Sequence, residues 1–181
     1  MVDTEKIAME KALQELLDKQ AITEVLNRYS RTLDWLDDEE HARCYWPDAE
    51  IDYGFFVGRA DEFVPVVMEV ERASKRRWHM LNSVQILLRN ETGADVECYG
   101  LAVGINDSEG EMKGNLYGGR YLDNFEKREA ESGLEWRISR RKYILDWTLP
   151  LPVQPDGSPR AEFPLHMLDL TQSGHEEYRP M

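Results

Sequence analysis

Hydrophobic positions in the first part of the chain recur at intervals of three and four, the spacing of one face of an α-helix. Between residues 6 and 36 this face consists of Leu13, Leu16, Leu17, Ala21, Ile22, Val25, Leu26, Tyr29 and Leu33. The pattern predicts one long amphipathic helix or two in succession. Helical spacing returns over residues 61–74, where acidic residues open the segment and basic residues follow its end, as the helix dipole favours.

A short helix and a short strand are predicted between these two segments. Asp38-Glu39-Glu40 provides a helix start, and the helix is expected to run through Tyr45 and to be closed by Pro47. Residues 49–53 alternate like a strand.

Four long extended segments then follow, at residues 78–89, 94–105, 114–125 and 134–147, separated by loops of hairpin type. Helices followed by a meander of strands indicate an α+β domain, in which an antiparallel sheet curls around the helices and encloses a cone-shaped interior. One compact domain over residues 1–149 is expected.

The remaining segment, residues 150–181, contains prolines at positions 150, 152, 155, 159 and 164, which oppose regular structure. Its hydrophobic residues, Leu165, Leu168 and Leu170 among them, could still pack. We expect a C-terminal arm that covers the pocket or a neighbouring subunit; the alternative is a frayed tail.

The charge balance narrows the range of partners. Lysine and arginine number 22 against 35 acidic residues, so the formal net charge is −13, which would repel nucleic acid and an anionic lipid surface. The sequence lacks the basic start and apolar run of a signal peptide and any membrane-length apolar stretch. Cys44 and Cys98 lack zinc-site spacing and are expected to be buried thiols of a soluble cytoplasmic protein.

The strongest candidate for chemistry is His79, downstream of an acidic cluster that contains Asp34 and Asp37. A carboxylate beside an imidazole makes an acid/base pair that needs neither a cofactor nor a metal. The histidines at 41, 166 and 175 are interpreted as surface or tail residues, and none shows metal-ligand spacing. The basic run at 137–142 is interleaved with apolar residues, which favours a strand whose solvated face pairs with the protein's own acid groups.

The order of several short motifs resembles the SnoaL-like members of the nuclear transport factor 2 (NTF2-like) superfamily, over about residues 13–147. The motifs are Asn27-Arg28-Tyr29-Ser30-Arg31-Thr32-Leu33-Asp34, Trp46-Pro47-Asp48-Ala49, Ile51-Asp52-Tyr53-Gly54, Trp78-His79-Met80-Leu81-Asn82, Gly118-Gly119-Arg120-Tyr121 and Trp136-Arg137-Ile138. The chain is most similar to the lyase branch, which includes scytalone dehydratase, bile acid 7α-dehydratase and hexachlorocyclohexane dehydrochlorinase. The resemblance implies a cone-shaped, cystatin-like barrel around a mostly apolar pocket, and a homo-oligomer, most simply a trimer.

The resemblance also implies roles for individual residues. Asp34 and His79 match the catalytic Asp–His pair, so Asp34 is preferred to Asp37, which is interpreted as a solvated helix-end residue. Tyr29 and Tyr53 match catalytic or substrate-orienting tyrosines. Contacts with the substrate are expected from Tyr117, Asn82 and Trp78. Two departures are the absence of a second histidine on the later strands and Leu145, which stands where an arginine of the bile acid enzyme aligns.

These residues predict a cofactor-independent lyase that acts on a hydroxylated aromatic or polycyclic small molecule. His79 would take a proton, Asp34 would orient its ring, and Tyr29 or Tyr53 would hydrogen-bond the departing oxygen. The reaction would be dehydration or carbon–carbon cleavage with release of formaldehyde. The alternatives are a non-catalytic small-molecule carrier or sensor, an interaction protein that resembles dioxygenase small subunits, and an isomerase or cyclase.

Overall fold

The computed structural model describes residues 2–158, 164–166, 168, 170, 172–179 and 181. The two longer helices, α1 (Val2–Trp35) and α3 (Ala60–Ala73), lie where the apolar spacing predicts them. The short helix α2 (Asp38–Ala42) begins at the predicted residue but ends before Tyr45, to which it was expected to run. Asp37 caps α2 by accepting a hydrogen bond from the Glu40 amide at 3.0 Å, so it is the helix-end residue that the sequence indicated.

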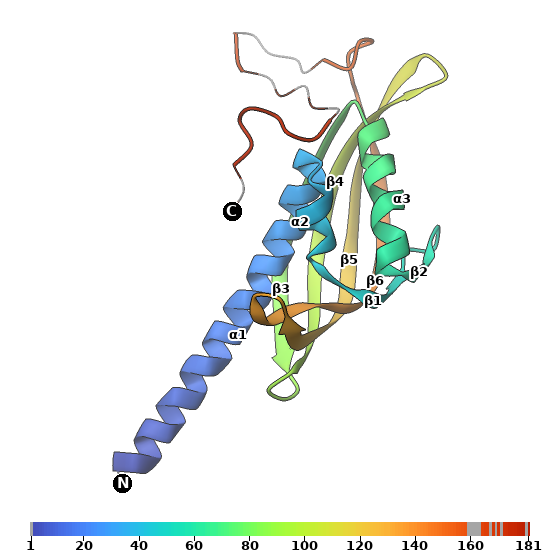
Figure 1. Ribbon diagram of the computed structural model, residues 1–181. Coiled ribbons are helices and arrows are strands. Elements are labelled where there is room, and N and C mark those ends of the chain that lie inside the picture. Colours follow the sequence, from blue (N-terminus) through green and yellow to red (C-terminus); the bar gives the residue numbers. More distant parts are fainter. Residues whose placement is uncertain (1, 159–163, 167, 169, 171, 180) are drawn as a thin grey trace.

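Six strands form one curved sheet in the order β2-β1-β6-β5-β4-β3 (Figure 1). The strands are β1 (Tyr45–Asp52), β2 (Val57–Arg59), β3 (Arg76–Leu88), β4 (Gly93–Ser108), β5 (Glu111–Ala130) and β6 (Gly133–Leu151). The last four form the predicted meander, and α1 and α3 pack in its concave side. The α+β class and the curled sheet are therefore confirmed.

The sheet is mixed and does not close. β1 pairs with β6 in parallel, whereas every other pair is antiparallel, and β2 and β3 remain as edges. β1 also begins earlier than expected, at Tyr45, and includes Pro47. This proline lies where the β1–β6 register shifts, a place where a residue without an N–H is tolerated.

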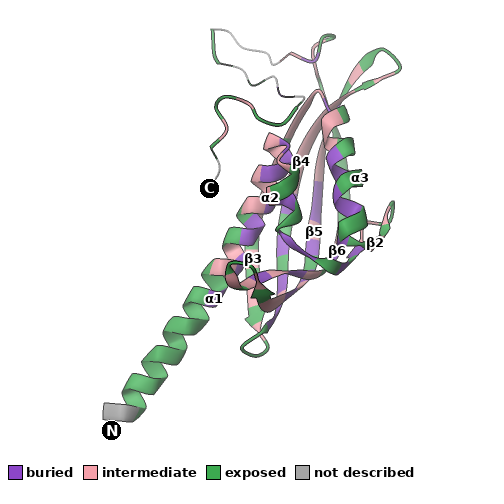
Figure 2. Cartoon of the chain, in the orientation of Figure 1, coloured by how far each residue is buried: buried purple, intermediate pink, exposed green. Residues whose placement is uncertain are grey.

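The first half of α1 extends beyond the sheet as an isolated rod (Figures 1 and 2). Leu13, Leu16 and Leu17 are exposed, although they belong to the periodic apolar face, whereas Ile22, Leu26 and Leu33 are buried. The apolar face is thus longer than the sheet that it packs against, and its first part has no partner within the described chain.

The described part of the C-terminal segment folds back onto its own chain. Arg77 Nη1 donates to the Leu170 carbonyl at 2.9 Å, and the Tyr178 hydroxyl donates to Asp37 Oδ2 at 2.5 Å. The Trp35 ring lies 5.6 Å from the Tyr178 ring. Leu170 is buried, whereas Leu165 and Leu168 are exposed. Beyond Leu151 the described residues form no helix or strand.

Candidate functional site

The concave face of the sheet carries its side chains in layers across β3, β4, β5 and β6. Paired residues of neighbouring strands point to the same face, so the strand register places His79, Ala102, Tyr117 and Thr148 in one layer. Two strands separate His79 from Tyr117, which puts their Cα atoms about 10 Å apart. Ala102, which lies between them on β4, has a small side chain.

Asp34, in the last turn of α1, contacts His79 near the start of β3. Oδ1 lies 2.8 Å from His79 Nδ1, and Oδ2 accepts the His79 backbone N–H at 3.1 Å. The two hydrogen bonds fix both the ring and its strand against the helix. The structure therefore brings together the Asp–His pair that the sequence predicted, across 45 positions of chain.

A second carboxylate, which the sequence analysis missed, reaches the other nitrogen of the ring. Glu71 lies in the last turn of α3, and its Oε1 is 3.6 Å from His79 Nε2. Arg77 ties the end of α3 to β3, because its Nε donates to the Glu71 carbonyl at 2.8 Å and its Nη2 donates to the Ser74 carbonyl at 2.6 Å. The imidazole is thus flanked by carboxylates from two helices.

These neighbours set the protonation of the site. Burial by itself would lower the pKa of His79, but the hydrogen bond that its ring donates to Asp34 and the charge of Glu71 outweigh burial and raise that pKa. Burial raises the pKa of Glu71, and the positive charges of His79 and Arg77 only partly oppose it. Protons are therefore held on this pair more strongly than on isolated side chains.

A layer of tyrosines lies deeper in the cone than the His79 layer. The Tyr29 and Tyr53 hydroxyl oxygens are 2.8 Å apart, and the Tyr53 ring stacks on Phe63 of α3 and on Tyr143. Tyr121 contacts Tyr29 edge to face. The two tyrosines selected from the sequence thus meet each other, together with two that were not selected.

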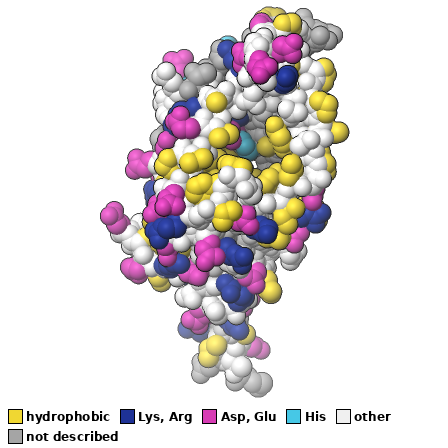
Figure 3. All heavy atoms as spheres, turned by 90° about the vertical axis from the view of Figure 1, so that its right-hand side faces the viewer, with side chains coloured by type: hydrophobic (Ala, Val, Ile, Leu, Met, Phe, Trp, Pro, Cys, Tyr) yellow, Lys and Arg dark blue, Asp and Glu magenta, His cyan; other side chains and the backbone are white. Residues whose placement is uncertain are grey.

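Two glycines allow these rings to lie against the sheet. A Cβ on Gly100 would come within 2.6 Å of the Tyr121 ring, and one on Gly119 would come within 2.6 Å of the Tyr143 hydroxyl. The glycines therefore line the wall between the tyrosine layer and the His79 layer with backbone alone. Figure 3 shows a hollow in this side of the molecule, rimmed by hydrophobic side chains, with a histidine side chain inside.

Below the tyrosines, Arg141 and Asp123 form a completely buried ion pair. Arg141 donates through Nε and Nη2 to the two Asp123 oxygens, at 2.9 and 2.6 Å. The guanidinium also lies 4.3 Å from the Tyr29 ring centre and 4.4 Å from that of Tyr121, within cation–π range. The basic run is therefore not uniformly solvated: Arg140 and Lys142 point outward, as the alternation predicts, but Arg141 points into the core.

The prediction that His41 lies on the surface is also wrong. This histidine is fully buried against the Tyr29 and Tyr45 rings, its Nδ1 lies 2.9 Å from the Thr32 hydroxyl, and its Nε2 has no hydrogen-bond partner among the described residues. Burial, and then the charge of Arg141, lower the pKa of His41 to about 3, so the ring is neutral. The acidic neighbours in the sequence concealed this burial.

The three residues expected to contact substrate fall on both faces of the sheet. Tyr117 shares the inner layer of His79. Trp78 is adjacent to His79 in the same strand, so its side chain points to the outer face, where it is 52% exposed. Asn82 lies opposite Tyr99, an exposed outer-face residue. The structure therefore does not bring Trp78 or Asn82 to the histidine.

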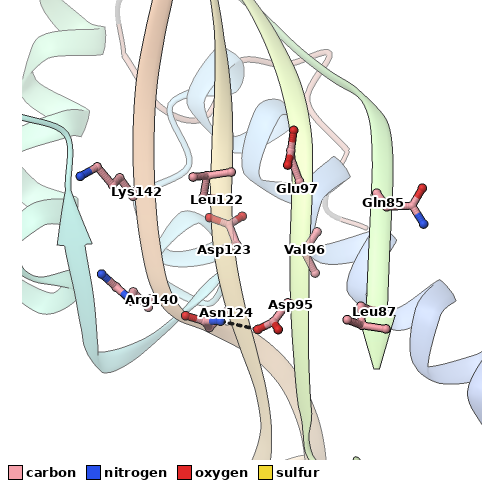
Figure 4. Close-up of a pocket in the computed structure, with 10 residues that line it drawn as sticks. All are labelled: Gln85, Leu87, Asp95, Val96, Glu97, Leu122, Asp123, Asn124, Arg140 and Lys142. Atoms are coloured by element: carbon pink, nitrogen blue, oxygen red, sulfur yellow. Dashed lines mark hydrogen bonds between the residues drawn. The ribbon is translucent and has the colours of Figure 1, made fainter. Parts of the chain in front are cut away.

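Two grooves lie away from this site. One, of about 380 Å³, is on the convex face of the sheet, where Leu122 and Lys142 point outward beside the Asn124–Asp95 hydrogen bond of 2.6 Å (Figure 4). The other, of about 740 Å³, lies between the exposed half of α1 and the β3–β4 turn. Neither includes His79, Asp34 or any of the four tyrosines of the inner layer.

Cys44 and Cys98 are both buried and free, as expected. Among the described residues, no three His, Cys, Asp or Glu side chains form a group that could hold a metal ion. No helix in the described part of the chain is long and apolar enough to cross a membrane.

Solved structures of similar fold include enzymes. A provisionally named scytalone dehydratase from Novosphingobium aromaticivorans is 23% identical with a TM-score of 0.68, and covers 79% of this chain and 93% of its own. A hexachlorocyclohexane dehydrochlorinase, LinA type 2, is 16% identical with a TM-score of 0.67, over 78% and 93%. The LinA-type3 dehydrochlorinase of Novosphingobium barchaimii is 16% identical with a TM-score of 0.66, over 77% and 94%.

Because the sequence identities to these structures are low, the similarity shows a shared fold and nothing more. No curated protein sequence matches the chain. The model of the SnoaL-like domain matches residues 14–142, from the middle of α1 to β6, which includes Asp34, Glu71 and His79. The chain therefore belongs to the SnoaL-like domain family of the NTF2-like superfamily.

Proposed function

We propose that this protein is a cofactor-independent lyase that eliminates a small group from a hydroxylated, largely apolar aromatic or polycyclic molecule. The observation that carries the proposal is the Asp34–His79 contact. Because Asp34 occupies Nδ1 at 2.8 Å, Nε2 is the nitrogen left to exchange a proton with a substrate. Proton transfer by a positioned side chain contributes about 10²- to 10⁴-fold to a rate.

The tyrosines support a further detail about the substrate. Tyr29 precedes Asp34 by five positions on one helix, which corresponds to a rise of about 7.5 Å. We assign the Tyr29–Tyr53 hydroxyl pair to a different oxygen of the substrate from the atom that His79 serves. A molecule with two polar ends separated by an apolar body, such as an aromatic or fused-ring compound, fits this spacing.

The test is to assay a panel of hydroxylated aromatic and polycyclic compounds with the wild type, His79→Ala and Asp34→Ala. Loss of water is detected as a new double bond in the ultraviolet spectrum, and carbon–carbon cleavage is detected as released formaldehyde. We expect both variants to lose at least about 10²-fold in rate. Full activity in either variant would disprove the mechanism.

A non-catalytic carrier or sensor with the same pocket makes the opposite prediction. Ligands of the panel would bind without turnover in any variant. The Tyr29–Tyr53 pair does not distinguish a lyase from a carrier or sensor, because the pair would bind an oxygen of the ligand in either protein.

We also propose that the protein forms a homo-oligomer, most simply a trimer. Support comes from apolar side chains exposed on the outer face of the sheet, among them Trp78, Tyr99, Trp147 and Leu149. The molar mass in solution, measured by light scattering, tests this: a value of three times 21.1 kDa is expected.

A further inference from the structure

Proton transfer by the Asp34–His79 pair does not by itself use the carboxylate of Glu71. Its Oε1 lies 3.6 Å from His79 Nε2, the nitrogen to which the proposed function assigns proton exchange with the substrate. Both side chains are nearly enclosed, with 13% of Glu71 and 10% of His79 exposed. A buried carboxylate beside a catalytic nitrogen is costly unless it is paired, and Arg77 Nε, at 3.8 Å from Oε2, is its other charged partner.

We propose that Glu71 is a second acid/base residue of the site, which exchanges a proton with His79 and delivers it to the departing oxygen. This inference rests on the proposed lyase function. It supplies an acid beside His79, a role for which the Tyr29–Tyr53 pair is less suited, because burial raises the pKa of both hydroxyls.

For loss of water the protons and electrons balance within the pair. His79 Nε2 takes the proton from a substrate carbon, and the electrons of that C–H bond form the new double bond. The carbon–oxygen bond breaks, and the oxygen takes the proton of the Glu71 carboxylic acid and leaves as water. The proton on His79 Nε2 then passes to the Glu71 carboxylate, which restores both groups without a proton from solvent.

The other charged or titratable groups around His79 are less suited to this role. Asp34, from α1, is bound to Nδ1 and to the backbone N–H. Arg77, from β3, does not release a proton in the neutral range. His41, from α2, is enclosed and bonded to Thr32. Tyr117, on β5, lies two strands away. Burial raises the pKa of Glu71, which favours the protonated form that the step requires.

The experiment compares Glu71→Gln with Glu69→Gln, a control on the same helix whose side chain is 76% exposed. With a substrate found by the panel, we expect Glu71→Gln to lower kcat by about 10²-fold and to remove one limb of the pH–rate profile. Glu71→Asp, which keeps a carboxylic acid, should recover part of the rate. Glu69→Gln should leave the rate and the profile unchanged.

A second measurement needs no substrate. In Glu71→Gln the pKa of His79, followed by NMR of the ring protons, should fall relative to the wild type. When the proton of the pair is on His79, Glu71 is the carboxylate that faces the imidazolium, and the variant lacks that counter-charge. An unchanged His79 pKa, or an unchanged kcat and pH profile, would overturn the role of Glu71. If His79→Ala and Asp34→Ala are inactive while Glu71→Gln is fully active, this inference fails and the lyase function stands. If no variant and no wild type turns over any substrate, the lyase function fails and this inference falls with it.

Discussion

Asp34 contacts His79 through both of its carboxylate oxygens, one to the ring Nδ1 at 2.8 Å and one to the backbone N–H at 3.1 Å. A single side chain thereby joins the end of α1 to the start of β3 and also selects which ring nitrogen is free. The position and the tautomer of the imidazole are therefore set by the same side chain.

Asp34→Asn should lower the pKa of His79, because the amide keeps the shape of the carboxylate but removes its charge. The measurement is an NMR titration of the histidine ring protons. Asp37→Asn is the matched control, since Asp37 lies near the same helix end, caps α2 and makes no contact with His79. A fall of equal size in the control would contradict the assignment.

Arg141→Met should destabilise the protein by about 3–5 kcal/mol, because it leaves the Asp123 carboxylate buried without its counter-charge. The double variant Arg141→Met with Asp123→Leu should recover most of this loss. Urea denaturation gives the free energies of unfolding. Arg140→Met, at an exposed neighbouring position, is the control and should change stability little. If the losses of stability in the two single variants simply add in the double variant, the Arg141–Asp123 interaction is not supported.

His41 should make the protein sensitive to acid. Its pKa is about 3 in the fold and near 6.5 in the unfolded chain, so between these values only the unfolded chain binds the proton. Stability from this residue is complete above pH 6.5 and is lost as the pH falls, with a slope of about 1.4 kcal/mol per pH unit. His41→Gln should reduce the slope of unfolding free energy against pH by about one proton. An unchanged slope would mean that His41 is not buried as described.

Gly119→Ala should destabilise the protein by about 1–3 kcal/mol, because its Cβ would lie 2.5 Å from the Ile144 carbonyl oxygen, which belongs to the backbone and cannot move aside. Gly104→Ala is the control, since its Cβ would meet only side-chain atoms, Asn106 Nδ2 at 3.3 Å and the Tyr117 ring at 3.7 Å. Thermal unfolding of both variants tests the comparison, and equal melting temperatures would contradict it.

Ending the chain at Ser158 should leave the SnoaL-like domain folded with a lower melting temperature, because the contacts of Leu170 with Arg77 and of Tyr178 with Trp35 are lost. A loss of about 1 kcal/mol shifts the melting temperature by about 2–4 °C in a chain of this size. Far-ultraviolet circular dichroism and thermal unfolding check both points. Loss of cooperative unfolding would show that residues 159–181 belong to the domain and do not form a separate arm.

Strand alternation in the sequence is sufficient to place Trp78 and Arg141 on the faces where the structure has them. Trp78 and His79 are consecutive, so they cannot face the same side of one strand. Arg141 lies two positions before Tyr143, so both side chains point to the same face of the strand, and Tyr143 packs against the core. The alternation therefore distinguishes Arg141 from its exposed neighbours Arg140 and Lys142. His41 offered no such signal, because it lies in a short helix between acidic and basic neighbours.

The sequence by itself determined the two longer helices, the four-stranded meander, the fold class and the Asp34–His79 pair, because these depend on local periodicity and on ordered motifs that recur in a family. Tertiary structure alone decided that Glu71 reaches the free nitrogen of His79, because the approach of α3 to β3 depends on Arg77 and on the curvature of the sheet. It also decided that the tyrosine layer lies between the Asp–His pair and the buried Arg141–Asp123 ion pair. The pairing register of the strands sets that order, and the register arises from contacts between distant parts of the chain.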